Sequence, residues 1–567
     1  MLSSDLIDQC YVEGGEPDGM DDADTLRDDY YREQAAAIHR IYGTLYPEGR
    51  NRYLLRRLDS PVGDAAGTKI LARAVDKPET SEVAGFHVLD EAYMGTYEAG
   101  GSPEDGVAMT ITAGIPHRPP QGEVAPVRTS PEFGNRSRLA QWLVWKSPVL
   151  FEQVKYYYEQ RSLRFRPERH SFSPVKRATS HPFGSLTGPR DTSKSPSILI
   201  GFHWLETGGA EKLAFDSVNW ALQAGFRVLI VADVPEVQRL ASKLPDDPNV
   251  EFIRLDAYLP RWQLFDFLEA LVRAENVRAM HIHHSTGLYD NLLRIKAAFP
   301  DLVVIDSTHI IEHENGGFPR TSGVWSNYID YHHVISRELA AFYLDVFGQS
   351  QKVKLGRMLP PRSDAEPEIE PVFNLEAGQR TCRLAFIGRM VHQKRAPLVV
   401  DVMRRLQKWA KGQNINLHLD MVGTGAYLEI VRAMIGKEKL GAVVTLHPAD
   451  ADVPSILRKS DILLIPSSNE GLTLVGYEAI GNGAIPISTD VGGQDELIPE
   501  ELLLPAEPRK CVRAAEALIV RLMTDSEFLE KCKSSVASKY HDLRRDPSAE
   551  DVLTSLYRDI LEGSKTT

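Results

Sequence analysis

Two glutamates separated by seven residues follow an apolar run in the second half of the chain. The run is ILLI, residues 462–465, and Glu470 and Glu478 follow it in EGLTLVGYE. The run is typical of a buried strand, which places Glu470 in the next loop and Glu478 on the next helix. If helical geometry held from Glu470 onward, the two positions would lie about 80° apart around the axis and about 12 Å apart along it.

Two carboxylates at this spacing suit a ligand that carries hydroxyl groups at both ends. One carboxylate would bind the hydroxyls of a sugar and the other those of a ribose, with backbone amides between them facing phosphate. The residues expected to line this helix start are Gly471, Leu472, Thr473 and Leu474. The alternative interpretation is a pair of surface glutamates on an ordinary helix.

Two cations follow an earlier strand, in RLAFIGRMVHQKRAP. Arg389 comes directly after Gly388 at the strand end, and Lys394 stands five residues later, before a helix. A guanidinium can bind a diphosphate bidentately and an ammonium adds a point charge. The pair could therefore stabilise the charge that grows on a departing diphosphate. The alternative is a solvated basic loop.

A glycine pair follows the strand expected at 198–202, in HWLETGGAEK. Gly208 and Gly209 precede a helix, where glycine lets backbone amides approach an anionic ligand closely. The alternative is a tight turn between a strand and a helix, with no ligand.

The elements that position these residues alternate regularly from Ser197 onward. Short β-branched runs alternate with amphipathic stretches, which predicts parallel sheets with crossover helices. PPRSDAEPEIEP, residues 360–371, divides the alternation in two. We expect an α/β fold with two Rossmann-like doubly wound domains, 197–370 and 371–567, facing a common cleft. The strands are expected at 198–202, 228–232, 250–255, 277–282, 302–306 and 333–336, and then at 384–388, 417–422, 443–446, 462–465 and 484–488.

The part of the chain before Ser197 lacks this alternation. Residues 1–163 predict an N-terminal region of unassigned function, and residues 164–196 are typical of a linker rich in Pro, Ser and basic residues. Within 139–166, aromatic residues precede several arginines. One interpretation is a helix that contacts an anionic membrane peripherally, together with the linker through residue 196. The other is a packing helix or partner interface, which the break at Pro148 favours.

Composition excludes several classes of protein. A formal net charge of −13 over 567 residues argues against a nucleic-acid binder. The four cysteines form no CxxC pair, and His281, His283 and His284 lack a carboxylate at ligand spacing, so we expect no metal site. We see no signal peptide and no apolar run of about 18 residues, and expect a cytoplasmic protein.

Four motifs in order over residues 197–505 resemble the GT-B glycosyltransferases, specifically glycosyltransferase family 4. They are the G-G-A-E element at 208–211, the G-R-…-K element ending at Lys394, the pair Glu470 and Glu478, and the G-G-x-x-E element of Gly492, Gly493 and Glu496. The resemblance implies a retaining glycosyltransferase with a nucleotide-diphosphate-sugar donor and no metal or other cofactor. The acceptor would be a saccharide or a lipid-linked molecule, in polysaccharide or glycoconjugate synthesis.

The resemblance also implies roles. Arg389 and Lys394 would stabilise the leaving diphosphate, Glu470 would contact the donor sugar, and Glu478 would hold the ribose. The Gly208–Gly209 loop would close near the phosphates. His309, in VVIDSTHIIEH, matches a family histidine near the donor sugar.

Three local features bear on the nucleotide base and on domain closure. Gly423, in the segment VGTG after the strand 417–422, is expected in a strand–helix turn near the donor base. Leu446-His447-Pro448 replaces the family's phenylalanine–glycine pair, and the asparagine–glycine turn expected after Val353 is missing. These departures leave base identity and domain closure open.

Two alternatives to glycosyl transfer remain. One is a nucleotide-sugar epimerase or a phosphorylase on the same architecture. The other is a non-catalytic scaffold that binds sugar nucleotides, which the complete set of two cations and two carboxylates argues against.

Overall fold

The computed structural model describes most of the chain, in twelve segments. They are residues 29–46, 50–58, 60–74, 87–88, 95–99, 107–118, 138–162, 189–206, 209–312, 316–359, 371–376 and 378–563. Gly208, most of the predicted linker and nearly all of the predicted interdomain stretch lie outside these segments.

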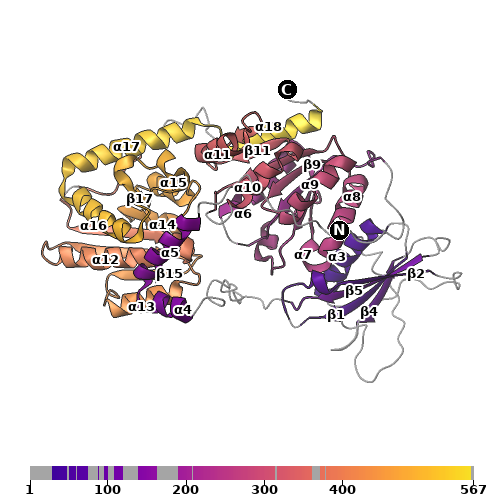
Figure 1. Ribbon diagram of the computed structural model, residues 1–567, viewed down its shortest axis with the longest axis horizontal. Coiled ribbons are helices and arrows are strands. Elements are labelled where there is room, and N and C mark those ends of the chain that lie inside the picture. The colour runs from indigo at the N-terminus through magenta and orange to yellow at the C-terminus, as the bar shows by residue number, and fades with distance from the viewer. Residues whose placement is uncertain are drawn as a thin grey trace, which may run out of the picture.

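Two parallel, doubly wound sheets form the part of the molecule from Ser197 onward (Figure 1). The strand order is β12-β11-β10-β9-β6-β7-β8 in the first sheet and β15-β14-β13-β16-β17-β18 in the second. In each sheet the first strand along the chain is central, so the winding direction reverses beside it. Ligands bind at this switch point, outside the carboxyl ends of the strands. The predicted fold class is confirmed.

The strands of both sheets are mostly buried on both faces, as helices on each side require. Those of the first sheet are β6 (Ser197–Phe202), β7 (Arg227–Ala232), β8 (Val250–Ile253), β9 (Val277–His283), β10 (Val303–Thr308), β11 (Tyr331–Val334) and β12 (Val353–Leu355). Those of the second are β13 (Thr381–Ile387), β14 (Asn416–Val422), β15 (Val444–His447), β16 (Ile462–Ile465), β17 (Ile485–Thr489) and β18 (Leu503–Leu504).

Helices cover the two sheets. The first domain contains α6 (Gly209–Ala224), α7 (Leu255–Tyr258), α8 (Leu264–Ala274), α9 (Thr286–Ala298), α10 (Gly317–Val324) and α11 (Arg337–Phe347). The second contains α12 (Ala396–Ala410), α13 (Leu428–Lys437), α14 (Val453–Leu457), α15 (Leu474–Gly481), α16 (Pro508–Thr524) and α17 (Ser526–Arg545). None of the described helices is long and apolar enough to cross a membrane.

The last helix, α18 (Ala549–Glu562), returns to the first domain. It packs against α6, and Leu553, Leu556 and Tyr557 enter the core of the first domain. In Figure 1, α17 lies along the second domain and α18 continues over the first. The part of the chain predicted as the second domain therefore contributes its last helix to the first domain. The α17–α18 junction is a second connection between the two domains.

The N-terminal region packs on both domains. Helix α3 (Asp29–Leu45) lies against α8 of the first domain, and Arg40 forms ion pairs with Glu251 and Glu275. A five-stranded sheet accompanies it, made of β1 (Arg50–Arg57), β2 (Lys69–Ala74), β3 (His87–Val88), β4 (Gly95–Ala99) and β5 (Val107–Ile115).

Two further helices of this region pack on the second domain. They are α4 (Arg138–Lys146) and α5 (Pro148–Ser162), with Ser147 between them. Val144 and Phe151 are buried in the core of the second domain. The predicted break at Pro148 is present, and one face of this helix pair packs within the fold.

Candidate active site

Two of the residues predicted to bind a donor form an ion pair between neighbouring loops of the second domain. Lys394 ends the short 3-10 helix η5 (His392–Lys394) after β13, and Glu470 follows β16, the strand beside β13. Lys394 Nζ lies 2.5 Å from Glu470 Oε1. The Glu470 side chain is 7% exposed and that of Lys394 is 21% exposed, so solvent reaches the pair from the lysine.

Hydrogen bonds fix these two loops against each other. Ser468 N donates to Gln393 O over 2.7 Å, and Gln393 Nε2 donates to Asn469 O over 2.9 Å. Ser467 Oγ also donates to Glu470 Oε1, over 2.5 Å. The cation and the carboxylate are therefore positioned before any ligand binds, which is the arrangement that electrostatic stabilisation requires.

Arg389 and Glu478 are not joined to this ion pair. Both side chains are exposed, and within the described segments neither forms an ion pair. Partial burial raises the pKa of Glu478, and the charge of Lys212 on α6 partly opposes that rise. Glu478 of the second domain and Lys212 of the first therefore lie near each other across the domain boundary.

Glu470 lies in the loop and Glu478 on the helix α15, as predicted, but the conditional spacing of about 80° and 12 Å does not apply, because α15 begins only at Leu474. Thr473 has extended backbone at the N-cap, so Glu470 lies in a loop and not on the helix axis. The amide and the hydroxyl of Thr473 both donate to Gln494 Oε1 over 3.1 Å, so this amide is not available to a phosphate. The side chain of Leu472 packs against the cores of both domains.

The first domain touches the Glu470 loop directly. A Cβ atom at Gly471 would lie 1.9 Å from the backbone oxygen of His309, so no side chain fits there. Asn469 Nδ2 donates to Ile311 O over 2.7 Å, again across the domain boundary. The structure therefore brings His309 and the Glu470 loop together in a closed arrangement.

The His309 imidazole is buried and uncharged at neutral pH. Burial lowers its pKa well below the ordinary value, and Nε2 has no hydrogen-bond partner among the described residues. Its ring lies 4.8 Å from that of His284 and perpendicular to it, and His284 Nε2 is also buried and unpartnered within the described part. Two imidazole nitrogens at the carboxyl ends of β9 and β10 thus have capacity for a polar ligand.

The histidines within β9 behave differently. His281 contacts Tyr557 Oη at 2.6 Å and Ser307 Oγ at 2.8 Å, so it belongs to the core. His283 is also buried, with its ring centroid 4.1 Å from that of His281. In the described segments, no group of His, Cys, Asp and Glu side chains has a metal-binding arrangement.

Of the remaining predicted glycines, Gly423 and Gly209 lie in described segments and Gly208 does not. Gly423 has a φ of +133°, and a Cβ there would lie 2.1 Å from the backbone oxygen of Gly388. The turn after β14 therefore packs tightly on the loop after β13. Gly209 begins α6, whereas Gly208 lies outside the described residues.

Helix α5 packs against the loop that carries Lys394, residues 388–395, through Glu152 and His392. The sequence did not indicate this contact. Glu152 is fully buried, and its carboxylate lies 2.9 Å from His392 Nδ1 and accepts a 2.9 Å hydrogen bond from Tyr427 Oη. His392 Nε2 lies 3.0 Å from Glu159. His392 begins the 3-10 helix that ends at Lys394. Glu152 and His392 are 240 residues apart, and no local pattern connects them.

Glu496 of the G-G-x-x-E element lies at the domain junction. Its carboxylate accepts from Arg337 N at the start of α11 over 2.8 Å and lies 2.6 Å from Arg357 Nη1. Arg357 is fully buried and also pairs with Asp546, between α17 and α18, at 2.6 Å. The element thus connects the second domain to the first and to the α17–α18 junction.

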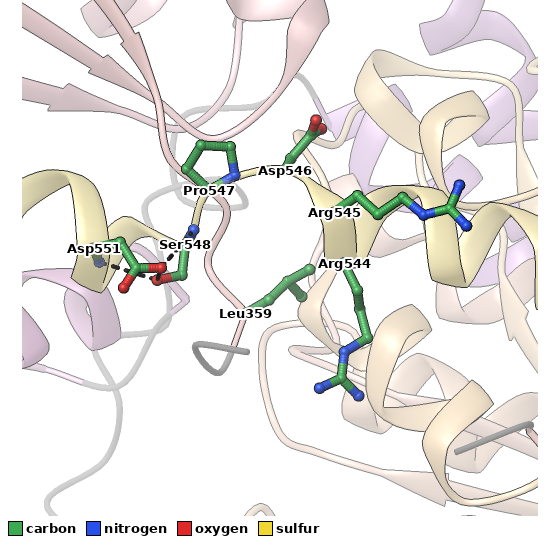
Figure 2. A pocket seen from close by; sticks show the side chains of 7 residues that line it. All are labelled: Leu359, Arg544, Arg545, Asp546, Pro547, Ser548 and Asp551. Atoms are coloured by element: carbon green, nitrogen blue, oxygen red, sulfur yellow. Dashed lines mark hydrogen bonds between the residues drawn. The ribbon is translucent and has the colours of Figure 1, made fainter. Parts of the chain in front are cut away.

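A cavity of about 240 Å³ lies beside this junction and not at the predicted donor site. Figure 2 shows its lining, in which Asp546 and Pro547 separate the arginines at the end of α17 from Ser548 and Asp551 at the start of α18. Ser548 and Asp551 cap α18 reciprocally. The lining residues are Leu359, Arg544, Arg545, Asp546, Pro547, Ser548 and Asp551.

Comparison with known proteins gives a family match for the second domain. Residues 373–538 match the family described as glycosyl transferases group 1. The glycogen synthase of Geotalea daltonii is 30% identical over 144 residues, which are 25% of this chain and 28% of that protein. The UDP-N-acetylglucosamine–peptide N-acetylglucosaminyltransferase GtfA subunit of Streptococcus agalactiae is 23% identical over 299 residues, 49% of this chain and 57% of that protein.

These matches cover only part of each relative: the chain spans 28% and 57% of the length of the two curated proteins. Among solved structures, a glycosyltransferase from Rickettsia africae aligns with a TM-score of 0.48 and 15% identity, over 66% of this chain and all of that one.

Proposed function

We propose that this chain, whose second α/β domain is a glycosyl transferases group 1 domain, transfers a sugar from a nucleotide-diphosphate-sugar donor to an acceptor hydroxyl. The observation that carries the proposal is the Lys394–Glu470 pair. It lies on adjacent loops at the switch point of the second sheet, against His309 of the first domain.

The proposed chemistry is transfer with retention at the anomeric carbon. The bond from that carbon to the diphosphate breaks, the acceptor oxygen forms the new bond from the same face, and its proton passes to a diphosphate oxygen. Arg389 and Lys394 stabilise the departing charge. Glu470 is held by Lys394 and Ser467, which suits binding of sugar hydroxyls rather than covalent attack.

The proposed donor and acceptor follow from the same residues. Lys394 and the exposed Arg389 supply the positive charge that a metal ion would otherwise bring to a diphosphate. Glu478 holds the ribose. The imidazoles of His284 and His309, whose Nε2 atoms have no partner among the described residues, face the transferred sugar and the acceptor. The relative named for UDP-N-acetylglucosamine supports uridine diphosphate sugars as the first donors to test, with a saccharide or lipid-linked acceptor.

A panel of nucleotide sugars tests the proposal. Thermal stabilisation of the full chain identifies the best donor, and hydrolysis or transfer of that donor measures turnover. We expect at least one nucleotide sugar to stabilise the chain and Lys394→Ala to abolish most of the turnover. Conversion of the donor to its epimer without acceptor would identify an epimerase, and binding without any turnover would identify a scaffold.

A further inference from the structure

Buried polar atoms without hydrogen-bond partners lie at the carboxyl ends of three neighbouring strands of the first sheet. Among the described residues, the atoms without a partner include Asp233 Oδ1 after β7, His203 Nδ1 after β6 and His284 Nε2 after β9. These strands are neighbours in the order β9-β6-β7, and Val234 N donates to His203 O over 3.2 Å. Burying such atoms without a partner is costly, so their position at one sheet edge points to a polar ligand.

Asp233 is held in place through one of its two carboxylate oxygens. Oδ2 accepts a 2.6 Å hydrogen bond from Gly287 N, in the first turn of α9. Burial raises the pKa of Asp233 to about 6, and Gly287 N, Arg261 and Ser285 partly oppose that rise. The carboxylate is therefore mostly ionised at neutral pH, and Oδ1 is a strong hydrogen-bond acceptor.

The two imidazoles are uncharged and lie against aromatic rings. His284 has a left-handed φ of +59°, and its ring lies parallel to that of Phe318 with the centroids 4.4 Å apart. The His203 ring lies 4.8 Å from that of Trp204. Burial lowers the pKa of both histidines, that of His284 to about 3. A neutral imidazole can donate or accept a hydrogen bond, and the neighbouring rings supply apolar surface, a combination typical of small-molecule sites.

These side chains begin beside the proposed donor site and extend along the sheet edge. The His284 ring lies 4.8 Å from that of His309, whose backbone lies against the Glu470 loop. In the order β10-β9-β6-β7, three strand spacings separate the strand that precedes His309 from the strand that precedes Asp233. At about 4.8 Å for each spacing, the two strands lie about 14 Å apart. A ligand that contacts both His309 and Asp233 must therefore extend across several strands.

We infer that Asp233, His203 and His284 form the acceptor subsite of this chain and bind the hydroxyl groups of a saccharide. Asp233 Oδ1 accepts a hydrogen bond from one hydroxyl, and the two imidazole nitrogens bind others. A saccharide matches this set because it carries several hydroxyls on a rigid frame, whereas a simple alcohol has only one. The inference rests on the proposed sugar transfer and adds a class of acceptor to it.

Acceptor kinetics of the full chain test the subsite. The donor is whichever of UDP-glucose, UDP-N-acetylglucosamine, GDP-mannose and ADP-glucose most stabilises the chain. The acceptors are p-nitrophenyl glycosides of glucose, galactose, mannose and N-acetylglucosamine, and octanol supplies a hydroxyl without a sugar ring.

Two variants change different members of the subsite. In Asp233→Asn, the amide oxygen can keep the bond from Gly287 N, so that an NH₂ donor takes the place of the acceptor Oδ1. His203→Phe keeps a ring beside Trp204 but removes Nδ1. The matched control is Asp246→Asn, which changes an exposed aspartate of the first domain.

We expect transfer to at least one glycoside and none to octanol. Asp233→Asn should raise the KM for the glycoside roughly tenfold or more, because a hydrogen bond to a charged group is lost, and His203→Phe should raise it roughly threefold. The control should not raise it. The kcat at saturating glycoside, the melting temperature and the thermal stabilisation by the donor should change far less, which distinguishes acceptor binding from a role in holding α9.

An acceptor KM that neither variant raises would overturn the subsite and leave the proposed sugar transfer intact. Transfer to octanol as efficient as to the glycosides would do the same. Loss of donor stabilisation with an unchanged acceptor KM would also overturn the subsite, because the residues would then act on the donor. Because His203→Phe changes a different residue, its result stands if Asp233→Asn unfolds. An unmodified chain that turns over none of the four donors would refute the proposed function, and the subsite with it.

Discussion

Lys394 and Glu470 neutralise each other in a site that is proposed to bind an anionic ligand. In the proposed function, a diphosphate would compete with Glu470 for the ammonium group, and sugar hydroxyls would bind the carboxylate that the lysine releases. Glu470 also accepts a hydrogen bond from Ser467 Oγ, which does not involve the lysine. In the ion pair, the Glu470 carboxylate thus occupies the position proposed for a phosphate beside Lys394, and the Lys394 ammonium occupies the position proposed for the sugar hydroxyls beside Glu470.

Replacement of Lys394 by alanine is expected to lower turnover by roughly tenfold or more, because the departing diphosphate loses a fixed cation. The fold should survive, since Lys394 is partly exposed and Glu470 keeps one donor. Turnover and melting temperature of the full chain measure both effects. Lys408→Ala on α12 is the control, an exposed lysine away from the loop. Equal turnover in both variants would refute the assignment.

Gly471→Ala tests whether the closed arrangement matters. The added Cβ would lie 1.9 Å from the His309 backbone oxygen, and a backbone atom cannot move aside as a side-chain end does. We expect the domains to separate slightly and kcat to fall roughly tenfold or more, since small misplacements in a site are costly. Gly441→Ala is the control, at a glycine with no neighbouring atom within 4 Å of the added carbon. Similar kinetics in the two variants would contradict closure.

Helix α5 connects the N-terminal region to the lysine loop through a buried ion pair. Burial opposes the protonation of His392, but Glu152 and Glu159 outweigh it and raise its pKa above 6.5. A histidine with a raised folded-state pKa contributes stability that is complete below pH 6.5 and is lost as the pH rises through the folded value. The attachment of α5 should therefore weaken as the pH rises above 6.5.

Glu152→Gln removes the charge that holds His392 and should destabilise the chain by on the order of 3 kcal/mol, as expected for a broken buried pair. The loss should be largest at acid pH, where His392 is charged, and smaller at pH 9. Melting curves between pH 5.5 and pH 9 measure the difference. The control is Glu530→Gln, which changes an exposed glutamate of α17. A loss that is independent of pH would argue against this pair.

At the level of elements, the sequence predicted what local patterns encode. The runs at β6 and β16 are fully buried along their length and are easily recognised as strands. β12 and β18 have three and two residues, too few for any pattern. The sequence predicted a start of α15 near Gly471, but the helix begins at Leu474. Gln494, in a distant loop, accepts hydrogen bonds from the amide and the hydroxyl of Thr473, and no local pattern indicates this contact. The partners of Glu152 and the return of α18 arise from tertiary packing alone.

For the whole molecule, one helix connects two surfaces. The inner side of α5 contacts His392, which begins the 3-10 helix that carries Lys394, and its outer side exposes Val154, Tyr157 and Tyr158. A contact made by the outer side of α5 would therefore lie on the same helix as the buried Glu152–His392 pair.

Three carboxylates lie close together at the domain junction. Glu338 of α11 lies near Glu496 and Asp495 of the second domain, and one oxygen of its carboxylate is buried without a partner among the described residues. Burial and then these two carboxylates raise the pKa of Glu338 to about 7. An acid with a raised folded-state pKa binds more protons when folded, so its contribution to stability falls as the pH rises from 4.5 through 7.

Glu338→Gln should therefore stabilise the closed molecule at pH 8 by about 1–2 kcal/mol, a figure reduced for partial solvent screening, and have little effect at pH 4.5. The amide has the size of the protonated acid and carries no charge against Glu496. Melting temperatures at the two pH values measure the effect. Glu550→Gln in the first turn of α18 is the control, because this partly exposed carboxylate is not among those that raise the pKa of Glu338. Stabilisation at pH 4.5, or none at pH 8, would show that repulsion across the junction does not limit closure.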